Sequence, residues 1–210
     1  MNKLKMIEAV HNKLGGGRAT EEIKAQYRSG VIKLHLGIAF NDLIVRVYQN
    51  SVNKSISDLD AYTKVYPIPS IHAADIYIGK KYVEIPTSTK KLLQLPNNNA
   101  IRHIWTTEDP PRECLYRDLG KETVYNQLEV STYLTNPRYE VIGDNIYLDS
   151  NIGDAAFLVA YLIVPFEEFT DEEDLPAPLE NNNTIIEEVY MKMLNLPQED
   201  TIMDDKVVRT

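Results

Sequence analysis

Cysteine is almost absent from this chain, because Cys114 is the only one among its 210 residues. A single thiol excludes a disulfide framework within the chain and is typical of proteins made in a reducing compartment. Long apolar runs are absent too, since the longest, residues 155–164, suits a strand and not the roughly 20 residues of a membrane-spanning helix. The first fourteen residues lack the uninterrupted apolar region of a signal peptide. We therefore expect a soluble protein, made in a cytoplasm, with no membrane span.

An excess of positive charge is also missing. The formal net charge is -9, and residues 167–210 carry 13 acidic and 3 basic residues, so the rest of the chain is close to neutral. Dedicated nucleic-acid binders usually show a basic balance or a basic stripe. We therefore expect no sequence-specific nucleic-acid partner, and we expect the acidic segment to face solvent or a protein.

Motifs that would carry chemistry are equally scarce. The glycines of residues 15–17 lack the spacing of a phosphate-binding loop, no serine stands in a G-x-S-x-G turn, and the four histidines are never paired at helical spacing. The acidic run Asp171, Glu172, Glu173 and Asp174 lacks the alternating ligands of a calcium loop. We therefore expect no enzymatic activity, no cofactor and no metal, although a hydrolase site built from scattered carboxylates stays an alternative.

Helical patterns occupy the start of the chain. Apolar residues recur at helical spacing over residues 4–14, and the three glycines that follow favour a turn. Thr20, with two glutamates after it, is a good helix start and predicts one long helix over residues 20–51. The alternation of Ile32, Leu34 and Leu36 leaves a strand as an alternative within that range.

Strand patterns follow from residue 66 to residue 164. Short runs rich in β-branched and aromatic residues are separated by Pro, Asn, Gly and Asp, as in an antiparallel sandwich or barrel. These runs are IYI, KYVEI, AIRHIW, TVYNQLEV, RYEVI, NIYLD and FLVAYLIV. The clearest local prediction is a hairpin at RYEVI-GDN-IYLD, in which Tyr139 and Val141 face Ile146 and Leu148 across a turn that begins at Gly143.

The last part of the chain combines an apolar strand, an acidic connector and a helix. Residues 157–164 predict a central strand covered on both faces, which Pro165 ends. The acidic run and the prolines of LPAP predict an extended connector. Thr184 and Glu187 form a capping box that predicts the start of an amphipathic helix ending before Pro197.

The predicted fold is therefore of the α+β class, with N-terminal helices, a central antiparallel β-sandwich or barrel and a C-terminal amphipathic helix. We expect three regions within one structural unit. These are a helical region (residues 1–65), an antiparallel β region (66–166) and an acidic connector with the last helix and tail (167–210).

The order of these elements resembles a known group of proteins over residues 20–196. The helices, then YVEIPTSTKKLLQLPNNNAIRHIW, then RYEVIGDNIYLDSNIGDAAFLVAYLIVPFEEF, then DEEDLPAP and a helix are similar to the neck and tail ring proteins of tailed bacteriophages. The resemblance is to the adaptor-like ring proteins of crAss-like phages of gut Bacteroidota.

The resemblance implies a non-enzymatic virion structural protein. It would form a closed ring, commonly of twelve copies, that links the portal to the tail and lines the channel through which DNA leaves. A ring of this kind needs two different complementary surfaces on each subunit. The candidate interface residues are Arg112, Arg117, Asp171, Glu172, Glu173, Asp174, Ile186, Tyr190 and Met193. A carbohydrate- or protein-binding β-sandwich module is the alternative.

Overall fold

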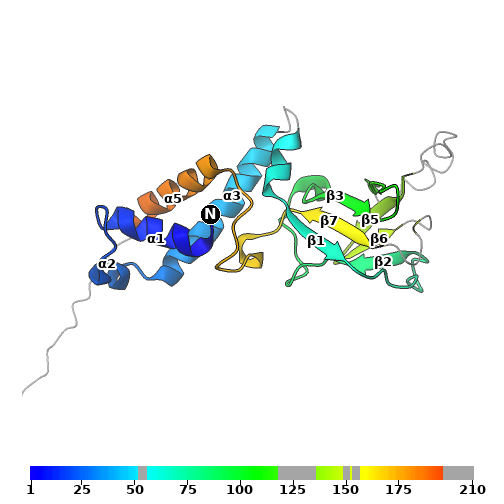
Figure 1. Ribbon diagram of the computed structural model, residues 1–210, viewed down its shortest axis with the longest axis horizontal. Helices are drawn as coiled ribbons and strands as arrows, with labels where there is room; N and C mark the ends of the chain where they lie inside the picture. The colour runs from blue at the N-terminus through cyan, green and yellow to red at the C-terminus, as the bar shows by residue number, and fades with distance from the viewer. Residues whose placement is uncertain (52–55, 118–135, 149–151, 153–156, 196–210) are drawn as a thin grey trace, which may run out of the picture.

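Helices gather at one end of the molecule and strands at the other in the computed structural model (Figure 1). The structure describes residues 1–51, 56–117, 136–148, 152 and 157–195. The α+β class that the sequence predicts is confirmed, with helices before the strands and one helix after them. None of the described helices is both long and apolar enough to span a membrane.

Among the described residues, four α-helices form the helical end: α1 (Lys3–Leu14), α2 (Glu21–Gln26), α3 (Ser29–Ser51) and α5 (Leu179–Leu194). The side chain of Asn2 caps α1, and Thr20 caps α2 as predicted by accepting a hydrogen bond from the backbone amide of Ile23 at 3.3 Å. The last helix lies beside α1 and α3, so the two ends of the described chain meet in one bundle (Figure 1).

The prediction of one continuous helix over residues 20–51 is wrong, because the chain breaks between α2 and α3. Tyr27 has φ −112° and ψ 90°, which no α-helix accommodates. Its carbonyl oxygen lies 2.8 Å from Nε2 of His11, a buried histidine on α1. The contact gives the Tyr27 carbonyl a partner on α1 at the break, and the strand alternative within α3 is excluded.

The strands that the structure describes form two sheets. One has the order β1 (Lys64–Ile68), β7 (Leu158–Leu162) and β3 (Ile101–Thr106), with antiparallel pairing throughout. The other has the order β2 (Lys81–Glu84), β6 (Asn145–Leu148), β5 (Arg138–Ile142) and β4 (Leu115–Tyr116). Its β4–β5 pair is parallel, which departs from the antiparallel prediction. A sandwich or barrel arrangement of the two sheets stays a prediction.

The predicted hairpin is confirmed in position and register. Tyr139 lies opposite Leu148 and Val141 opposite Ile146, while Gly143 has φ 60° in the turn. Glycine adopts this left-handed conformation without the steric cost of a Cβ atom. Asn145, predicted in the turn, is instead the first residue of β6.

Strand β7 is central in its sheet, as predicted, but it is fully covered on one face only. Leu158, Ala160 and Leu162 are buried, whereas Val159 and Tyr161 are half-buried. The alternation follows from the pleat of a sheet that packs one face on the core.

Two local predictions are wrong, and a third lies outside the described residues. The run IYI is a turn and not a strand, and the run TVYNQLEV lies outside the described residues. The last helix begins at Leu179 after Pro178, five residues before the predicted start. Thr184 therefore lies inside α5, where its hydroxyl donates to the carbonyl of Glu180 at 3.1 Å, and it forms no capping box.

Candidate functional site

The acidic connector, residues 167–178, is bound along the surface of its own chain. The Asp171 carboxylate accepts a hydrogen bond from Lys33 on α3 at 2.6 Å, and Glu173 accepts one from Lys64 at the start of β1 at 2.8 Å. Lys33 lowers the pKa of Asp171 mainly through this hydrogen bond. The two contacts hold the connector between the helical end and the strand end.

The N-terminal segment also packs against the connector. Leu4 donates its backbone amide to the carbonyl of Asp171 at 3.5 Å, and the backbone of Asn2 bridges to that of Asp174. Lys3 is buried, donates to the carbonyl of Phe169 at 2.6 Å and lies 4.3 Å from the centre of the Phe166 ring. Burial, and then Lys33, lower the pKa of Lys3, against the opposing effect of Asp171.

Glu168 fixes the beginning of the connector to a loop of the strand end. Its carboxylate accepts four hydrogen bonds of 2.5 to 2.9 Å from the backbone amides and hydroxyls of Ser88 and Thr89. Burial raises the pKa of Glu168, but these hydrogen bonds outweigh it and leave the pKa below its ordinary value. These hydrogen bonds thus hold the connector against the rest of the chain.

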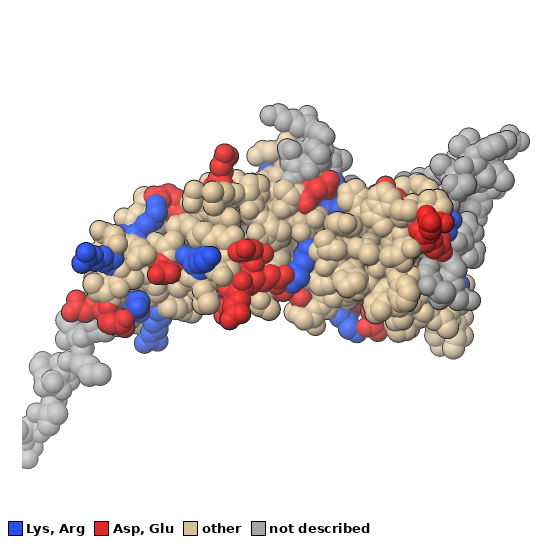
Figure 2. Space-filling model, viewed as in Figure 1, with Lys and Arg blue, Asp and Glu red and all other residues tan. Residues whose placement is uncertain are grey.

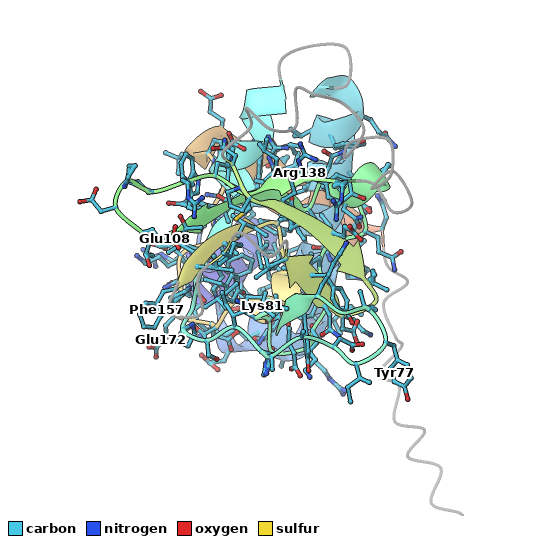
Figure 3. All side chains as sticks on the ribbon, turned by 90° about the vertical axis from the view of Figure 1, so that its right-hand side faces the viewer. Tyr77, Lys81, Glu108, Arg138, Phe157 and Glu172 are labelled. Carbon is cyan, nitrogen blue, oxygen red and sulfur yellow. The ribbon has the colours of Figure 1, made fainter. Side chains whose placement is uncertain are left out.

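Some connector acids still face solvent. Glu172 is exposed, and the side chain of Asp174 is 77% exposed although its carboxylate forms an ion pair with the N-terminal ammonium at 3.2 Å. Figure 2 shows acidic side chains gathered where the connector crosses the middle of the molecule. In Figure 3 the labelled Glu172 lies at the edge of the molecule. These exposed carboxylates form the acidic ridge, defined here as Glu172 and Asp174.

The two arginines predicted at an interface have partners within the same chain. Arg117 is 3% exposed and forms an ion pair with the buried Glu140, which also accepts a hydrogen bond from Lys80 at 2.7 Å. Arg112 forms an ion pair with Glu108. Arg117 is therefore a core residue of its own chain, and its assignment to an interface stays a prediction.

The predicted interface residues of the last helix are buried or half-buried. Ile186 and Met193 are 4% and 2% exposed and pack in the core of the helical end. Their assignment to an interface stays a prediction. Tyr190 is half-buried, and the ammonium of Lys13 lies 5.7 Å from its ring centre. The amphipathic face of α5 is used against α1 and α3 of the same chain.

Exposed apolar side chains occur where the sequence reading did not place an interface. On α3, Val31, Leu34 and Ile38 are 39%, 62% and 43% exposed. In the turn before β2, Ile76 and Tyr77 are 94% and 96% exposed, more than any other large apolar side chains described. Asp75 and Gly79, four residues apart, are typical turn residues and could have predicted this turn. The apolar run IYI between them favoured a strand instead.

Two neighbouring hollows lie at the other end of β2. Their volumes are about 470 and 490 Å³, and residues 91–94 line both. One hollow is completed by Ile85, Val141 and the turn of the β5–β6 hairpin, the other by Val45 and Pro165. We call the pair the Leu92 groove.

Within the described ranges, no group of three or more His, Cys, Asp and Glu side chains is placed to hold a metal ion. No protein-family model and no characterised protein matches the sequence.

Proposed function

We propose that this protein is a structural subunit of an oligomeric ring in the neck or tail of a tailed bacteriophage virion. In this role it links the portal to the tail, lines the DNA channel and catalyses no reaction. The observation that carries the proposal is the presence of two separated apolar surfaces on an elongated subunit, one on α3 and one at the turn before β2. Exposed apolar surfaces of this kind mark contacts with other proteins.

The rigid connector supports the same role. A ring subunit must hold its helical end and its strand end in one fixed relation, so that each copy meets the next at the same angle. The ion pairs of Asp171 and Glu173, on α3 and β1, provide such a link. The acidic ridge then suits a channel wall, because exposed carboxylates repel the phosphates of passing DNA.

Electron microscopy tests the proposal directly. Negatively stained particles of the purified protein, alone and mixed with the products of neighbouring genes, should be closed rings. Single subunits in every mixture would contradict the ring.

A second candidate, a carbohydrate- or protein-binding module, is favoured by one aromatic cluster. The exposed ring of His72 stacks on Tyr82 with ring centres 4.9 Å apart, and Tyr82 lies 5.7 Å from Tyr147. Of these three rings only that of His72 is exposed, and an exposed ring offers a flat face to a ligand. Binding to a glycan array that His72→Ala and Tyr82→Ala abolish would favour this candidate over the ring.

A further inference from the structure

One face of α3 is left uncovered by the other helices of the chain. Helices α1 and α5 contact α3 (Figure 1), yet Val31, Leu34 and Ile38 on α3 remain 39%, 62% and 43% exposed. Their spacing of three and four residues places these side chains in one row along two turns of the helix. We call Val31, Leu34 and Ile38 the α3 stripe. An apolar row that meets water on a helix surface favours a second helix as its cover.

Charged residues of opposite sign stand at the two ends of the α3 stripe. Arg28 is exposed, and its carbonyl accepts hydrogen bonds from the amides of Val31 and Ile32 at 2.9 and 3.2 Å, so it leads directly into α3. Asp42 is exposed at the other end, and the half-buried His35 lies midway. Arg28, His35 and Asp42 are seven residues apart, close to two helical turns, so they form a second row beside the stripe.

These two end charges are available to a partner. Among the residues that the structure describes, neither Arg28 nor Asp42 has an ion-pair partner. Lys33 and Arg46 on the same helix are instead paired, at 2.6 and 2.8 Å, with acids of the connector and of α5. A partner that covers the stripe would therefore meet one free positive and one free negative charge.

The charged row complements itself in a second copy. Arg28 lies seven residues before His35 and Asp42 seven residues after it, so a second α3 turned end for end about His35 places each arginine against an aspartate. The same rotation brings the two stripes together at their middle. A parallel pair would instead place arginine beside arginine and aspartate beside aspartate. Charges that flank an apolar seam set partner choice and orientation, so these favour an antiparallel copy of the same helix.

We propose that α3 of one chain packs antiparallel against α3 of a second copy and forms a two-fold dimer of the free chain. The contact covers both stripes and adds two ion pairs between Arg28 and Asp42. Three apolar side chains from each copy make a small interface, so the dimer forms and separates reversibly. A two-fold contact joins two copies and stops there, so the dimer goes beyond the proposed ring and does not depend on it.

Charge reversal tests the ion pairs. Arg28→Glu and Asp42→Arg each place like charges together at both ends of the contact, so each should weaken the dimer at least about tenfold at low salt. The chain with both substitutions restores opposite charges and should dimerise within about threefold of the wild type. Sedimentation equilibrium measures the dimer, which has twice the 24.0 kDa of the chain. A double variant as weak as either single variant would overturn the antiparallel contact.

Cross-linking tests the direction of the two helices. Arg28→Cys and Asp42→Cys are purified separately, one with a tag that changes its mass, and mixed with a short bismaleimide that bridges helices about 10 Å apart. The two variants should link to each other, because one ion pair survives in the mixed dimer. Each variant alone should stay unlinked, since copies of the same residue lie about 20 Å apart along an antiparallel pair. Links within each variant alone would require parallel helices and would overturn the proposal.

The wild type is the control for this reaction. Cys114 is 3% exposed, so the unsubstituted chain should not react with the bismaleimide and should stay unlinked. Links in the wild type would show that the reagent reports on Cys114, and the mixed dimer would then lose its value as support.

Leu34→Ser tests the α3 stripe itself. Leu34 is 62% exposed and Leu179 on α5 is 68% exposed, so serine at either position removes little packing within the chain. Leu34→Ser should weaken the dimer at least about tenfold, whereas Leu179→Ser should leave it unchanged. Equal dissociation constants for the two variants would overturn the proposal. A closed ring that forms without any of these effects would also overturn the α3 pair but would leave the ring function standing.

Discussion

Gly37 lies directly against the ring of Phe166. A Cβ atom at Gly37 would come 3.1 Å from Cδ1 of Phe166, which is closer than ordinary van der Waals contact. Phe166 is 2% exposed and also contacts Phe40 and the ammonium of Lys3. This close approach brings α3 against the start of the connector, where the helical end meets the strand end.

Alanine at Gly37 should therefore destabilise the protein, although alanine normally favours a helix. Gly30→Ala is the matched control, because Gly30 belongs to the same helix and nothing lies within 4 Å of its Cβ position. We expect Gly30→Ala to raise the free energy of unfolding by about 0.5 to 1 kcal/mol. Gly37→Ala should lower it by about 1 kcal/mol because the buried Phe166 ring must move. Urea denaturation compares the two variants, and an equal gain in both would contradict the close packing.

The buried Glu140 should make stability depend on pH. Burial raises the pKa of Glu140, but the hydrogen bonds from Lys80 and Arg117 lower it by more than burial raises it. The net pKa therefore lies below the ordinary value of a glutamate. A carboxyl whose pKa is lowered on folding stabilises the protein above its unfolded pKa of about 4.3, and this stability is lost as the pH falls through the folded pKa. Thermal melting between pH 7 and pH 3 should show the loss.

Glu140→Gln isolates this contribution. The change leaves two cations beside a neutral amide, so we expect a loss of about 3 kcal/mol at pH 7 and a flatter dependence of the melting temperature on pH in acid. Glu84→Gln, which removes an exposed ion pair with Lys90, is the control and should melt close to the wild type. The same pH dependence in both variants would show that Glu140 is not the responsible group.

The hydroxyl of Tyr66 should be dispensable. It is buried and has no hydrogen-bond partner in the part of the chain that the structure describes. Burial, with Glu168 and Glu173 nearby, raises the pKa of Tyr66 to about 12. Tyr66→Phe removes a buried polar atom without a partner, so the free energy of unfolding should stay the same or rise by about 1 kcal/mol. A loss of more than about 1 kcal/mol would reveal a partner for the hydroxyl.

The sequence predicted elements whose determinants are local. The φ of Gly143 fixes the β5–β6 hairpin, and the side chain of Thr20 caps α2, so short-range patterns were sufficient there. The break at Tyr27 involves a contact with His11, sixteen residues away on another helix, which no local pattern reports. The burial of Ile186 likewise depends on which helices α5 meets.

The candidate interface was harder to predict for the same reason. Acidic and basic residues that look available in the sequence, such as Asp171 and Arg117, find partners in distant segments once the chain folds. Ile76 and Tyr77, by contrast, are exposed in the structure, although their sequence pattern is typical of a buried strand. Exposure of an apolar side chain is a property of the whole fold, so the sequence could not reveal it.

The acidic ridge should reduce the affinity of the ring for DNA. Glu172→Gln with Asp174→Asn removes two exposed charges, so linear duplex DNA should bind the assembled ring more tightly at low salt. Glu22→Gln with Glu180→Gln removes two exposed charges on the helical end and serves as the control. Fluorescence anisotropy of labelled DNA measures both. Equal affinity in the two double variants would count against a channel-facing ridge.

Self-assembly tests the central claim most directly. Size-exclusion chromatography with light scattering over rising protein concentration gives the mass of each species. The ring proposal predicts one closed multimer of fixed mass, about 290 kDa if twelve copies of the 24.0 kDa chain assemble. A protein that stays at 24.0 kDa at every concentration, and also when mixed with the products of neighbouring genes, would contradict it.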